Sequence, residues 1–160
     1  MLEVKPVNYT NTKQAQELVD LMCAYSIDQM GGGTELSDQV KNELPRSLAS
    51  VPNAYSFIAY VHGVAAGLIN TFEGFSTFKC KPLLNIHDVV VLPEYRGQGI
   101  SQAMLNAVED LAKQRGCIKL TLEVLEGNQV AQDSYLKYGF CGYELDPKMG
   151  KALFWEKLLT

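Results

Sequence analysis

The sequence predicts an α/β protein with one mixed β-sheet that is covered by helices. Segments of alternating or continuous apolar residues, typical of strands, are interspersed with segments of helical spacing, in the order β-α-α-β-β-β-α-β-α-β-β. Such alternation favours a mixed sheet with helices on both faces. The chain has 160 residues, of which 47% are hydrophobic. This length is enough for one domain with its own core and short for two, so we expect a single domain over residues 1–160.

A strand and two helices are expected near the start of the chain. The strand covers residues 2–7, LEVKPV. Asn11 or Thr12 is a suitable cap for the first helix, because short polar side chains accept hydrogen bonds from the amides at a helix start. Ser37 is placed to cap the second helix, which Pro45 must bend or end because proline lacks an amide hydrogen.

A hairpin and a central strand are expected next. The segments AYSFIAYV and VAAGLINTF flank His62-Gly63, a pair typical of a tight turn between two strands. Residues 73–82, EGFSTFKCKP, are then expected to form a loop. Residues 83–92, LLNIHDVVVL, are expected to form a strand, and its almost entirely apolar end is typical of a central position in a sheet.

The second half of the chain continues the alternation. Apolar residues follow helical spacing from Ile100 to Ala112, and Gly116 is placed to end this helix. Residues 118–124, IKLTLEV, alternate as a strand does. The last expected elements are a helix from Asn128 to about Lys137 that Gly139 ends, a strand over residues 140–145, FCGYEL, and a strand over residues 151–159, KALFWEKLL.

Composition argues against several classes of protein. No apolar run approaches the ~20 residues of a membrane span, and the first residues lack the pattern of a signal peptide, so we expect a soluble cytoplasmic protein. The net charge of −4 argues against a nucleic-acid-binding surface. The four cysteines, Cys23, Cys80, Cys117 and Cys141, form no CxxC pair, and the chain has two histidines. We therefore expect no metal site, and we interpret the cysteines as buried reduced thiols.

Residues 89–105, VVVLPEYRGQGISQAML, join a strand to a helix through a turn that suits a phosphate group. Gly97 and Gly99 remove side chains where the backbone must approach a ligand. The first amides of the following helix have no intrahelical partners, and the helix dipole favours anions there. Arg96 adds a positive charge. On this pattern alone a plain strand-to-helix turn stays an equal alternative.

Two nucleotide-binding motifs can be compared with these residues. The dinucleotide-binding fingerprint requires a third glycine at position 102, where the chain has Gln102. The phosphate-binding loop of the nucleotide triphosphatases requires Gly-Lys followed by Ser or Thr after four intervening residues, and no such string occurs. Neither motif is therefore present in its usual form.

The turn resembles the coenzyme A motif of the GNAT N-acetyltransferases, [Arg/Gln]-x-x-Gly-x-[Gly/Ala]. It stands here as Arg96-Gly97-Gln98-Gly99-Ile100-Ser101, with a serine at the last position in place of glycine or alanine. A second stretch, LTLEVLEGNQVAQDSYLKYGF over residues 120–140, also resembles the family. The resemblance implies the GNAT acyl-CoA N-acyltransferase fold with a splayed pair of central strands. It also implies transfer of an acetyl group from acetyl-CoA to an amine.

Within that resemblance, the cofactor-binding groups lie on one strand, on the turn and at one helix start. The strand over residues 84–92 would carry a bulge and part from the strand over residues 118–124, so that the pantetheine arm bonds to exposed main-chain groups as an added strand does. The diphosphate would bind the amides of the turn. The implied cofactor-binding residues are Val89, Val90, Val91, Arg96, Gly97, Gln98, Gly99, Ile100, Ser101, Gln102 and Asn128.

The resemblance also suggests catalytic residues, each beside a structural alternative. Tyr135 matches the family tyrosine that protonates the leaving thiolate, although its spacing also suits a core aromatic. Asn128 suits a helix cap equally well. Glu123 is the favoured general base, which the amine needs because it is mostly protonated at neutral pH. Glu73, His87 and Asp88 are rival bases.

The acceptor is expected to bind between the first helices, the three glycines at residues 31–33 and the loop over residues 74–81, with Tyr25, Phe75 and Phe78 as candidate walls. Direct transfer in a ternary complex is expected, since no cysteine lies in a recognisable nucleophile setting. The acceptor itself stays open among an antibiotic, a polyamine, an amino acid and a peptide amine. A non-catalytic acyl-CoA sensor is the alternative function, and the apolar final strand suggests a possible homodimer.

Overall fold

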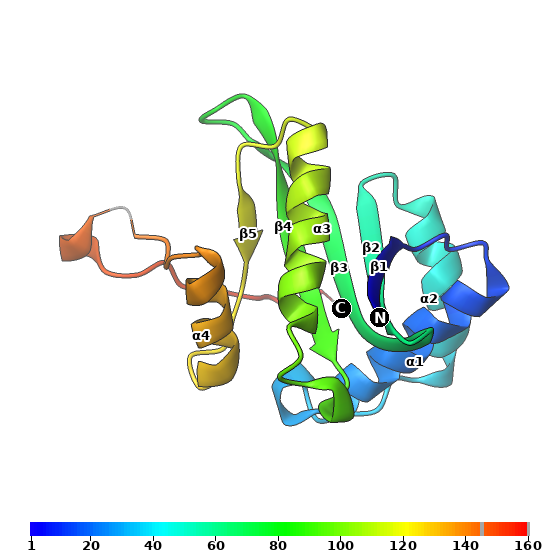
Figure 1. Cartoon of the computed structure of the whole chain (residues 1–160). Coiled ribbons are helices and arrows are strands. Elements are labelled where there is room, and N and C mark those ends of the chain that lie inside the picture. The colour runs from blue at the N-terminus through cyan, green and yellow to red at the C-terminus, as the bar shows by residue number, and fades with distance from the viewer. Residues whose placement is uncertain (145, 160) are drawn as a thin grey trace. The chain divides into compact units, whose positions relative to one another are not determined.

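A computed structural model describes residues 1–144 and 146–159, which divide into two compact units, Met1–Leu125 and Glu126–Thr160. The first unit contains a five-stranded sheet in the order β1-β2-β3-β4-β5 (Figure 1). Neighbouring strands are antiparallel except for β4 and β5, which are parallel, so the predicted mixed sheet is confirmed. The strands are β1 (Leu2–Pro6), β2 (Ala54–Val61), β3 (Val64–Ser76), β4 (Lys81–Val91) and β5 (Leu120–Leu122).

Three α-helices belong to the first unit, and local signals fix where they begin. The side chain of Asn11 accepts a hydrogen bond at the start of α1 (Thr12–Ile27), and that of Ser37 does so at the start of α2 (Asp38–Ser50), as predicted. The helix α2 continues past Pro45, so the proline does not end it. The third helix, α3 (Ile100–Gln114), lies along the face of the sheet opposite to α1 and α2 (Figure 1).

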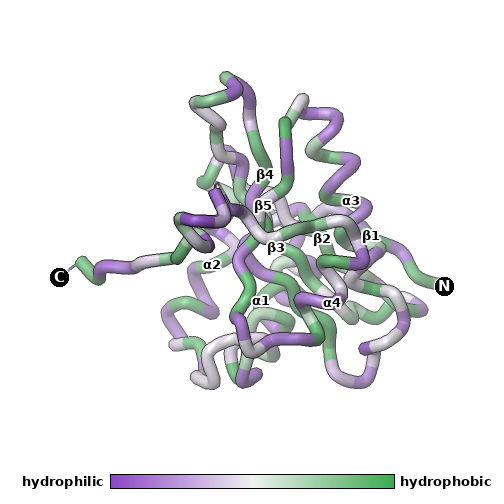
Figure 2. The backbone as a smooth tube through the Cα atoms, turned by 90° about the vertical axis from the view of Figure 1, so that its left-hand side faces the viewer, coloured by the Kyte–Doolittle hydropathy of each residue, from purple (hydrophilic) through white to green (hydrophobic). Residues whose placement is uncertain are grey.

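Alternation along the strands gives each face of the sheet its own core. On one face, Ile58, Leu68 and Val90 pack with buried leucines of α1. The residues between them point to the other face, where Ile69 is fully buried. The helix α3 contributes Met104 and its neighbours to that face, and its hydrophobic and hydrophilic residues alternate along the helix (Figure 2). Buried apolar surface thus holds helices on both sides of β3 and β4.

Gly67 allows α3 to approach β3 closely. A Cβ added there would lie 2.9 Å from the carbonyl oxygen of Val90 and 3.2 Å from side-chain carbons of Ile100 and Met104. Because the first of these is a main-chain atom that cannot rotate away, we expect Gly67→Ala to lower the free energy of unfolding by about 1–3 kcal/mol. Urea denaturation measures this. Gly74→Ala is the control, since its Cβ would meet only side-chain atoms of Leu83; equal stabilities of the two variants would contradict the prediction.

The hairpin between β2 and β3 has the predicted turn, and the next connection differs from the prediction. His62 and Gly63 have φ angles of 50° and 83°, the left-handed conformations that a two-residue hairpin turn requires. Residues 73–82 were expected to form a loop, but β3 and β4 continue into them and pair as far as Ser76 and Lys81. Main-chain pairing extends the hairpin here although the side chains do not alternate in polarity.

The second unit contains α4 (Gln129–Tyr138), which begins after Asn128 and ends at Gly139 as predicted. The two final strands that the sequence predicts are not found in the part of the chain that the structure describes, where Glu144 and Lys151 form a single bridge. Leu145, inside the first of these segments, lies outside the described residues. Alternation predicts which face a residue takes, but a strand also needs a neighbour for its main-chain groups. The prediction of these two strands was therefore wrong.

The structure also tests two expectations from composition, the burial of the cysteines and the lack of a membrane-spanning segment. Cys80 and Cys141 are exposed, whereas Cys23 and Cys117 are half-buried, so the expectation of four buried thiols was wrong. The sequence does not show whether a given cysteine is buried, because burial depends on residues that are far apart along the chain. Among the described residues, no helix is long and apolar enough to cross a membrane.

Tyr60 of β2 is buried against α1, and its hydroxyl donates a hydrogen bond to Oε2 of Glu17 at 2.8 Å. Burial, and next the hydrogen bond to this carboxylate, raise the pKa of Tyr60 from 10.0 to about 12. In the unfolded chain the phenol loses its proton near pH 10, whereas in the folded protein it keeps it, so stability present below pH 10 is lost as the pH rises toward 12. The loss is about 2 kcal/mol.

We therefore expect the free energy of unfolding to fall between pH 10 and pH 12, and Tyr60→Phe to fall less steeply over that range. Chemical denaturation at successive pH values measures both. Tyr143→Phe, at an exposed position, is the control and should leave the slope of the wild-type protein unchanged. The same slope in Tyr60→Phe and wild type would contradict the assignment.

Candidate functional site

The strands β4 and β5 part after a short stretch of pairing. Their paired residues end at Ile86 and Leu122, while β4 continues to Val91 alongside β3. A bulge lies at the same point, because Asn70 faces Asp88 whereas Thr71 faces Ile86, which leaves His87 as the extra residue of β4. Bulges bend a strand and interrupt pairing. The predicted bulge and the splayed pair of central strands are thus confirmed.

Main-chain groups of β4 beyond the bulge face alternately toward β3 and toward the side of β5. The amide of Leu92 donates to the carbonyl of Ala66 at 2.9 Å, so Leu92 is hydrogen-bonded to β3. Since alternate residues of an antiparallel strand share this orientation, Val90 also faces β3. Val89 and Val91 then face the side from which β5 has departed. A ligand that adds to this side of β4 would use the main chain of Val89 and Val91.

The turn after β4 exposes backbone at the start of α3. A short 3-10 helix, Pro93–Tyr95, leads to Gly97 and Gly99, which have φ angles of 76° and 75°. No atom lies within 4 Å of a Cβ added at either glycine. The first turn of α3 has no acidic residue, and its first intrahelical bond runs from the amide of Ala103 to the carbonyl of Gly99. Open backbone at a helix start without negative charge fits a diphosphate.

Arg96 connects this turn to the end of α1. Its guanidinium donates to Oδ2 of Asp28 at 2.9 Å and to the carbonyl oxygen of Val91 at 3.1 Å. The other carboxylate oxygen of Asp28 accepts from the amide of Met30, at the start of a short 3-10 helix, Gln29–Gly31. The Met30 amide, and next Arg96, lower the pKa of Asp28 below its ordinary value. The ion pair of Arg96 with Asp28 thus joins the turn before α3 to the segment that leads into the three glycines at residues 31–33.

The remaining residues implied for the cofactor and the general acid belong to α4 in the second unit. Oδ1 of Asn128 accepts from the amide of Ala131 at 3.2 Å, so the side chain caps α4. Tyr135 is half-buried, and its ring meets that of Phe140 edge to face with centroids 5.8 Å apart. The structural alternatives for both residues, a cap and a packed aromatic, are therefore present.

The base candidates differ in their surroundings. Glu123 is exposed and directly follows the last residue of β5, just as His87 directly follows the last residue of β4 that pairs with β5. His87 is exposed, and its ring lies edge-on to Phe72 at 5.5 Å between centroids. Both side chains therefore lie where the two strands begin to part.

Glu73 is committed to another interaction. Its carboxylate accepts a hydrogen bond from Nε of Arg115, and the Arg115 guanidinium lies over the ring of Tyr55 at 4.8 Å. The ion pair gives Glu73 a structural role between β3 and the end of α3. Of the two interpretations of Glu73, a general base and a structurally paired side chain, this contact favours the second.

Asp88 ends a buried chain of hydrogen bonds that crosses three strands. Tyr9 bonds to Ser56 at 2.9 Å, the hydroxyl of Ser56 donates to Oδ1 of Asn70 at 2.6 Å, and Nδ2 of Asn70 donates to Oδ2 of Asp88 at 2.9 Å. Ser56 and Asn70 are 3% and 4% exposed. Asp88 can be identified as a candidate from the sequence, whereas the other three residues cannot, because their contacts join segments far apart along the chain.

One of the three candidate acceptor walls is packed in place. Tyr25 is half-buried, and a Cβ added at Gly31 would lie 1.9 Å from its carbonyl oxygen, so only glycine fits there. Burial raises the pKa of Tyr25, and the negative charges of Asp88 and Asp28 raise it further. Phe78 is 98% exposed, and Phe75 is exposed as well. Tyr25 is therefore packed in place, whereas the two phenylalanines are not.

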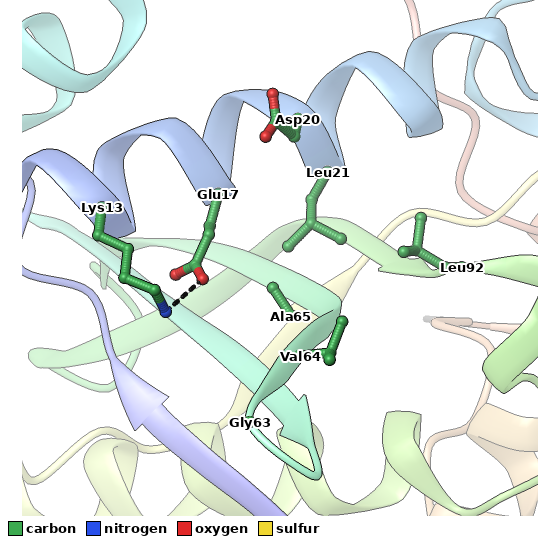
Figure 3. A pocket seen from close by; sticks show the side chains of 8 residues that line it. All are labelled: Lys13, Glu17, Asp20, Leu21, Gly63, Val64, Ala65 and Leu92. Atoms are coloured by element: carbon green, nitrogen blue, oxygen red, sulfur yellow. Dashed lines mark hydrogen bonds and ion pairs between the residues drawn. The ribbon is translucent and has the colours of Figure 1, made fainter.

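A cavity of about 370 Å³ lies beside α1 at the turn between β2 and β3 (Figure 3). Its lining includes none of the residues predicted to bind the cofactor. Glu17 is bonded to Lys13 and Tyr60, and Asp20 accepts from Gln16, so both carboxylates have partners within the protein. The cavity is lined by Lys13, Glu17, Asp20, Leu21, Gly63, Val64, Ala65 and Leu92.

Known acetyltransferases are similar to this chain in sequence. Residues 15–140 match the pattern of the Acetyltransferase (GNAT) family. The chain is 40% identical over 68 residues to the thialysine N-epsilon-acetyltransferase of Bos taurus, which covers 42% of this chain and 39% of that protein. It is 34% identical over 94 residues to the streptothricin acetyltransferase of Streptomyces lavendulae, which covers 56% of this chain and 50% of that protein. The chain thus spans half or less of the length of these relatives.

The fold is also similar to a solved structure that holds a cofactor analogue. The structure of AAC(6')-Iy in complex with the bisubstrate analogue CoA-S-monomethyl-acetylneamine has a TM-score of 0.78 and 18% identity, over 99% of both chains. At this identity the likeness concerns the fold. Because the family pattern covers most of the chain, including the turn at Arg96 and the helix α4, the chain belongs to the acetyltransferase (GNAT) family.

Proposed function

We propose that the protein is an N-acetyltransferase that moves an acetyl group from acetyl-CoA to an amine, directly, in a ternary complex. The observation that carries this proposal is the parting of β4 and β5 directly before the glycine turn at the start of α3. The parted strand offers amide and carbonyl groups to an extended arm, and the turn offers amides to a diphosphate. Both parts of coenzyme A have complementary groups within one short stretch of chain.

The residues of this stretch divide the work of holding the cofactor. The main chain of Val89 and Val91 would bond to the pantetheine amides, while Val90 keeps β4 attached to β3. The backbone from Gly97 to Gln102, including Gln98, Ile100 and Ser101, would bind the diphosphate, to which the Ser101 hydroxyl can donate. Arg96 would bring positive charge to the same end of the helix.

When bound, acetyl-CoA supplies an activated acetyl group as a thioester. Val89 or Val91 would donate an amide hydrogen to the thioester oxygen, where negative charge develops as the amine attacks. Glu123 would accept the proton that the amine loses, through a water molecule, and Tyr135 would donate its phenolic proton to the leaving thiolate. Asn128, besides capping α4, would contact the coenzyme A arm.

The acceptor is proposed to be a small molecule with a cationic amine. The similar proteins named above act, by their names, on thialysine and streptothricin. The net charge of −4 of this chain suits such acceptors. Tyr25 and Asp88, on the face of the sheet covered by α1, provide an aromatic and an anionic group for an amine.

The test is release of coenzyme A, detected as free thiol, from acetyl-CoA with a panel of thialysine, L-lysine, spermidine and kanamycin. We expect release above the amine-free rate with at least one of the four, together with binding of acetyl-CoA by calorimetry. Binding without amine-dependent release from any of the four would favour the acyl-CoA sensor. Absence of acetyl-CoA binding would reject the cofactor and with it the proposal.

A further inference from the structure

We infer that Asp88 binds the amine group of the acceptor and that Asn70 is the positioning residue that holds its carboxylate in place. The inference rests on the proposed function and adds to it the residues that select a cationic acceptor. Asn70 has no place in the cofactor site, and its role follows from the hydrogen bonds that cross β2, β3 and β4.

The chemistry of the side chains fixes the direction of these hydrogen bonds. Oδ1 of an asparagine only accepts, so the hydroxyl of Ser56 must donate its single hydrogen to Asn70. Ser56 can then only accept from Tyr9, whose phenol is the donor at 2.9 Å. Nδ2 of Asn70 in turn donates to Asp88. All three donors therefore point along the chain toward one carboxylate, and each bond polarises the next.

Because its members are buried, this series of hydrogen bonds puts the stability of the fold at risk if any partner is missing. Ser56 and Asn70 are 3% and 4% exposed, and they share the α1 face of the sheet with Ile58 and Leu68, which are fully apolar. A buried polar group whose partner is missing costs about 1–3 kcal/mol. Apolar residues at both positions would continue the core without that risk. The direction of the donors toward Asp88 gives a reason for polar residues here that packing alone does not give.

Asp88 has one oxygen held and one available. Oδ2 accepts from Asn70, and no described residue donates a hydrogen bond to Oδ1. Asp88 follows the bulge at His87. It directly precedes Val89, the first residue whose main chain faces the side from which β5 has departed. The Asp88 charge also acts on the half-buried phenol of Tyr25. A carboxylate with one oxygen held by a hydrogen bond and the other available is complementary to the N–H groups of a protonated amine.

The inference is tested by a double-mutant cycle on Asn70 and Asp88. Asn70→Leu keeps the volume and removes the donor, and Asp88→Asn removes the charge. For each panel amine that is acetylated, we expect each single variant to lower kcat/KM for the amine by about tenfold or more, the effect of losing ~1.4 kcal/mol. The KM for acetyl-CoA should stay within about twofold. In the Asp88→Asn background, Asn70→Leu should have almost no further effect, because the residue acts through Asp88.

Thr71→Val is the matched control for loss of a buried hydrogen bond. Thr71 is 1% exposed, neighbours Asn70 on β3 and donates to the carbonyl of Tyr55 at 2.8 Å. This variant should lose stability as Asn70→Leu does and keep the kinetics of the wild type for the amine. Ser56→Ala interrupts the chain one step earlier and should give a smaller loss in the same direction, which keeps the test valid if Asn70→Leu does not fold.

Three kinetic results would overturn the inference. They are wild-type amine kinetics in Asn70→Leu and Ser56→Ala, additive effects in the double variant, and an equal loss in Thr71→Val. A second measurement, calorimetric binding of spermidine to the protein without acetyl-CoA, distinguishes failure of this inference from failure of the proposed function. Wild-type protein that binds spermidine more tightly than Asp88→Asn but releases no coenzyme A would support the amine site and reject the transferase. Equal binding by the two proteins would reject the amine site.

Discussion

Replacement of Gly99 by valine is expected to remove acetyl-CoA binding. The φ angle of Gly99 is 75°, and the space around its Cα is open, so that a valine side chain would project where the diphosphate is proposed to lie. The same side chain would hinder the amides of Ile100 and Ser101. We expect the Kd for acetyl-CoA to rise by at least about 100-fold, which corresponds to ~2.7 kcal/mol of binding free energy. Isothermal titration calorimetry with acetyl-CoA measures this.

The control for Gly99→Val must reproduce its backbone strain at another place. Gly116, at the far end of α3, has a φ angle of 70° and also has no atom within 4 Å of an added Cβ. A β-branched residue with positive φ costs similar conformational energy at both positions. Gly116→Val is therefore the control. It should lose about as much stability in thermal unfolding as Gly99→Val, and only Gly99→Val should lose the binding of acetyl-CoA. Retention of wild-type affinity in Gly99→Val would refute the placement of the diphosphate.

Features that depend on neighbouring residues in the sequence were predictable. Asn11, Ser37 and Asn128 each accept an amide hydrogen of the helix that follows within three residues, and this geometry needs no information from elsewhere. The turn at His62 and Gly63 is equally local. The same holds for the glycine turn before α3, whose conformation and following helix are visible in a few residues.

Features that join distant segments were not predictable from the sequence. Arg96 and Asp28 are 68 residues apart, and nothing in either segment indicates the other as its partner. The hydrogen-bond chain through Ser56 and Asn70 depends on the register of β2 on β3 and on a bulge in β4. The predicted strand over residues 151–159 failed for the same reason, since its pairing depends on a partner segment.

Replacement of Tyr135 by phenylalanine is expected to lower turnover and leave acetyl-CoA binding intact. The phenol is proposed to protonate the leaving thiolate, and general acid catalysis contributes about 10²–10⁴ in rate. Phenylalanine keeps the ring that meets Phe140 edge to face and removes only the hydroxyl. We therefore expect kcat to fall by about 100-fold or more while the Kd for acetyl-CoA stays near that of the wild type.

Tyr138 provides a matched control on the same helix. It is half-buried as Tyr135 is, and its ring also lies near Phe140, with centroids 6.0 Å apart. Tyr138→Phe removes a hydroxyl from α4 without touching the proposed acid, so it should keep wild-type kcat with the fastest amine of the panel. A fall of equal size in both variants would assign the effect to the packing of α4. Full turnover in Tyr135→Phe would show that the thiolate leaves without help from this residue.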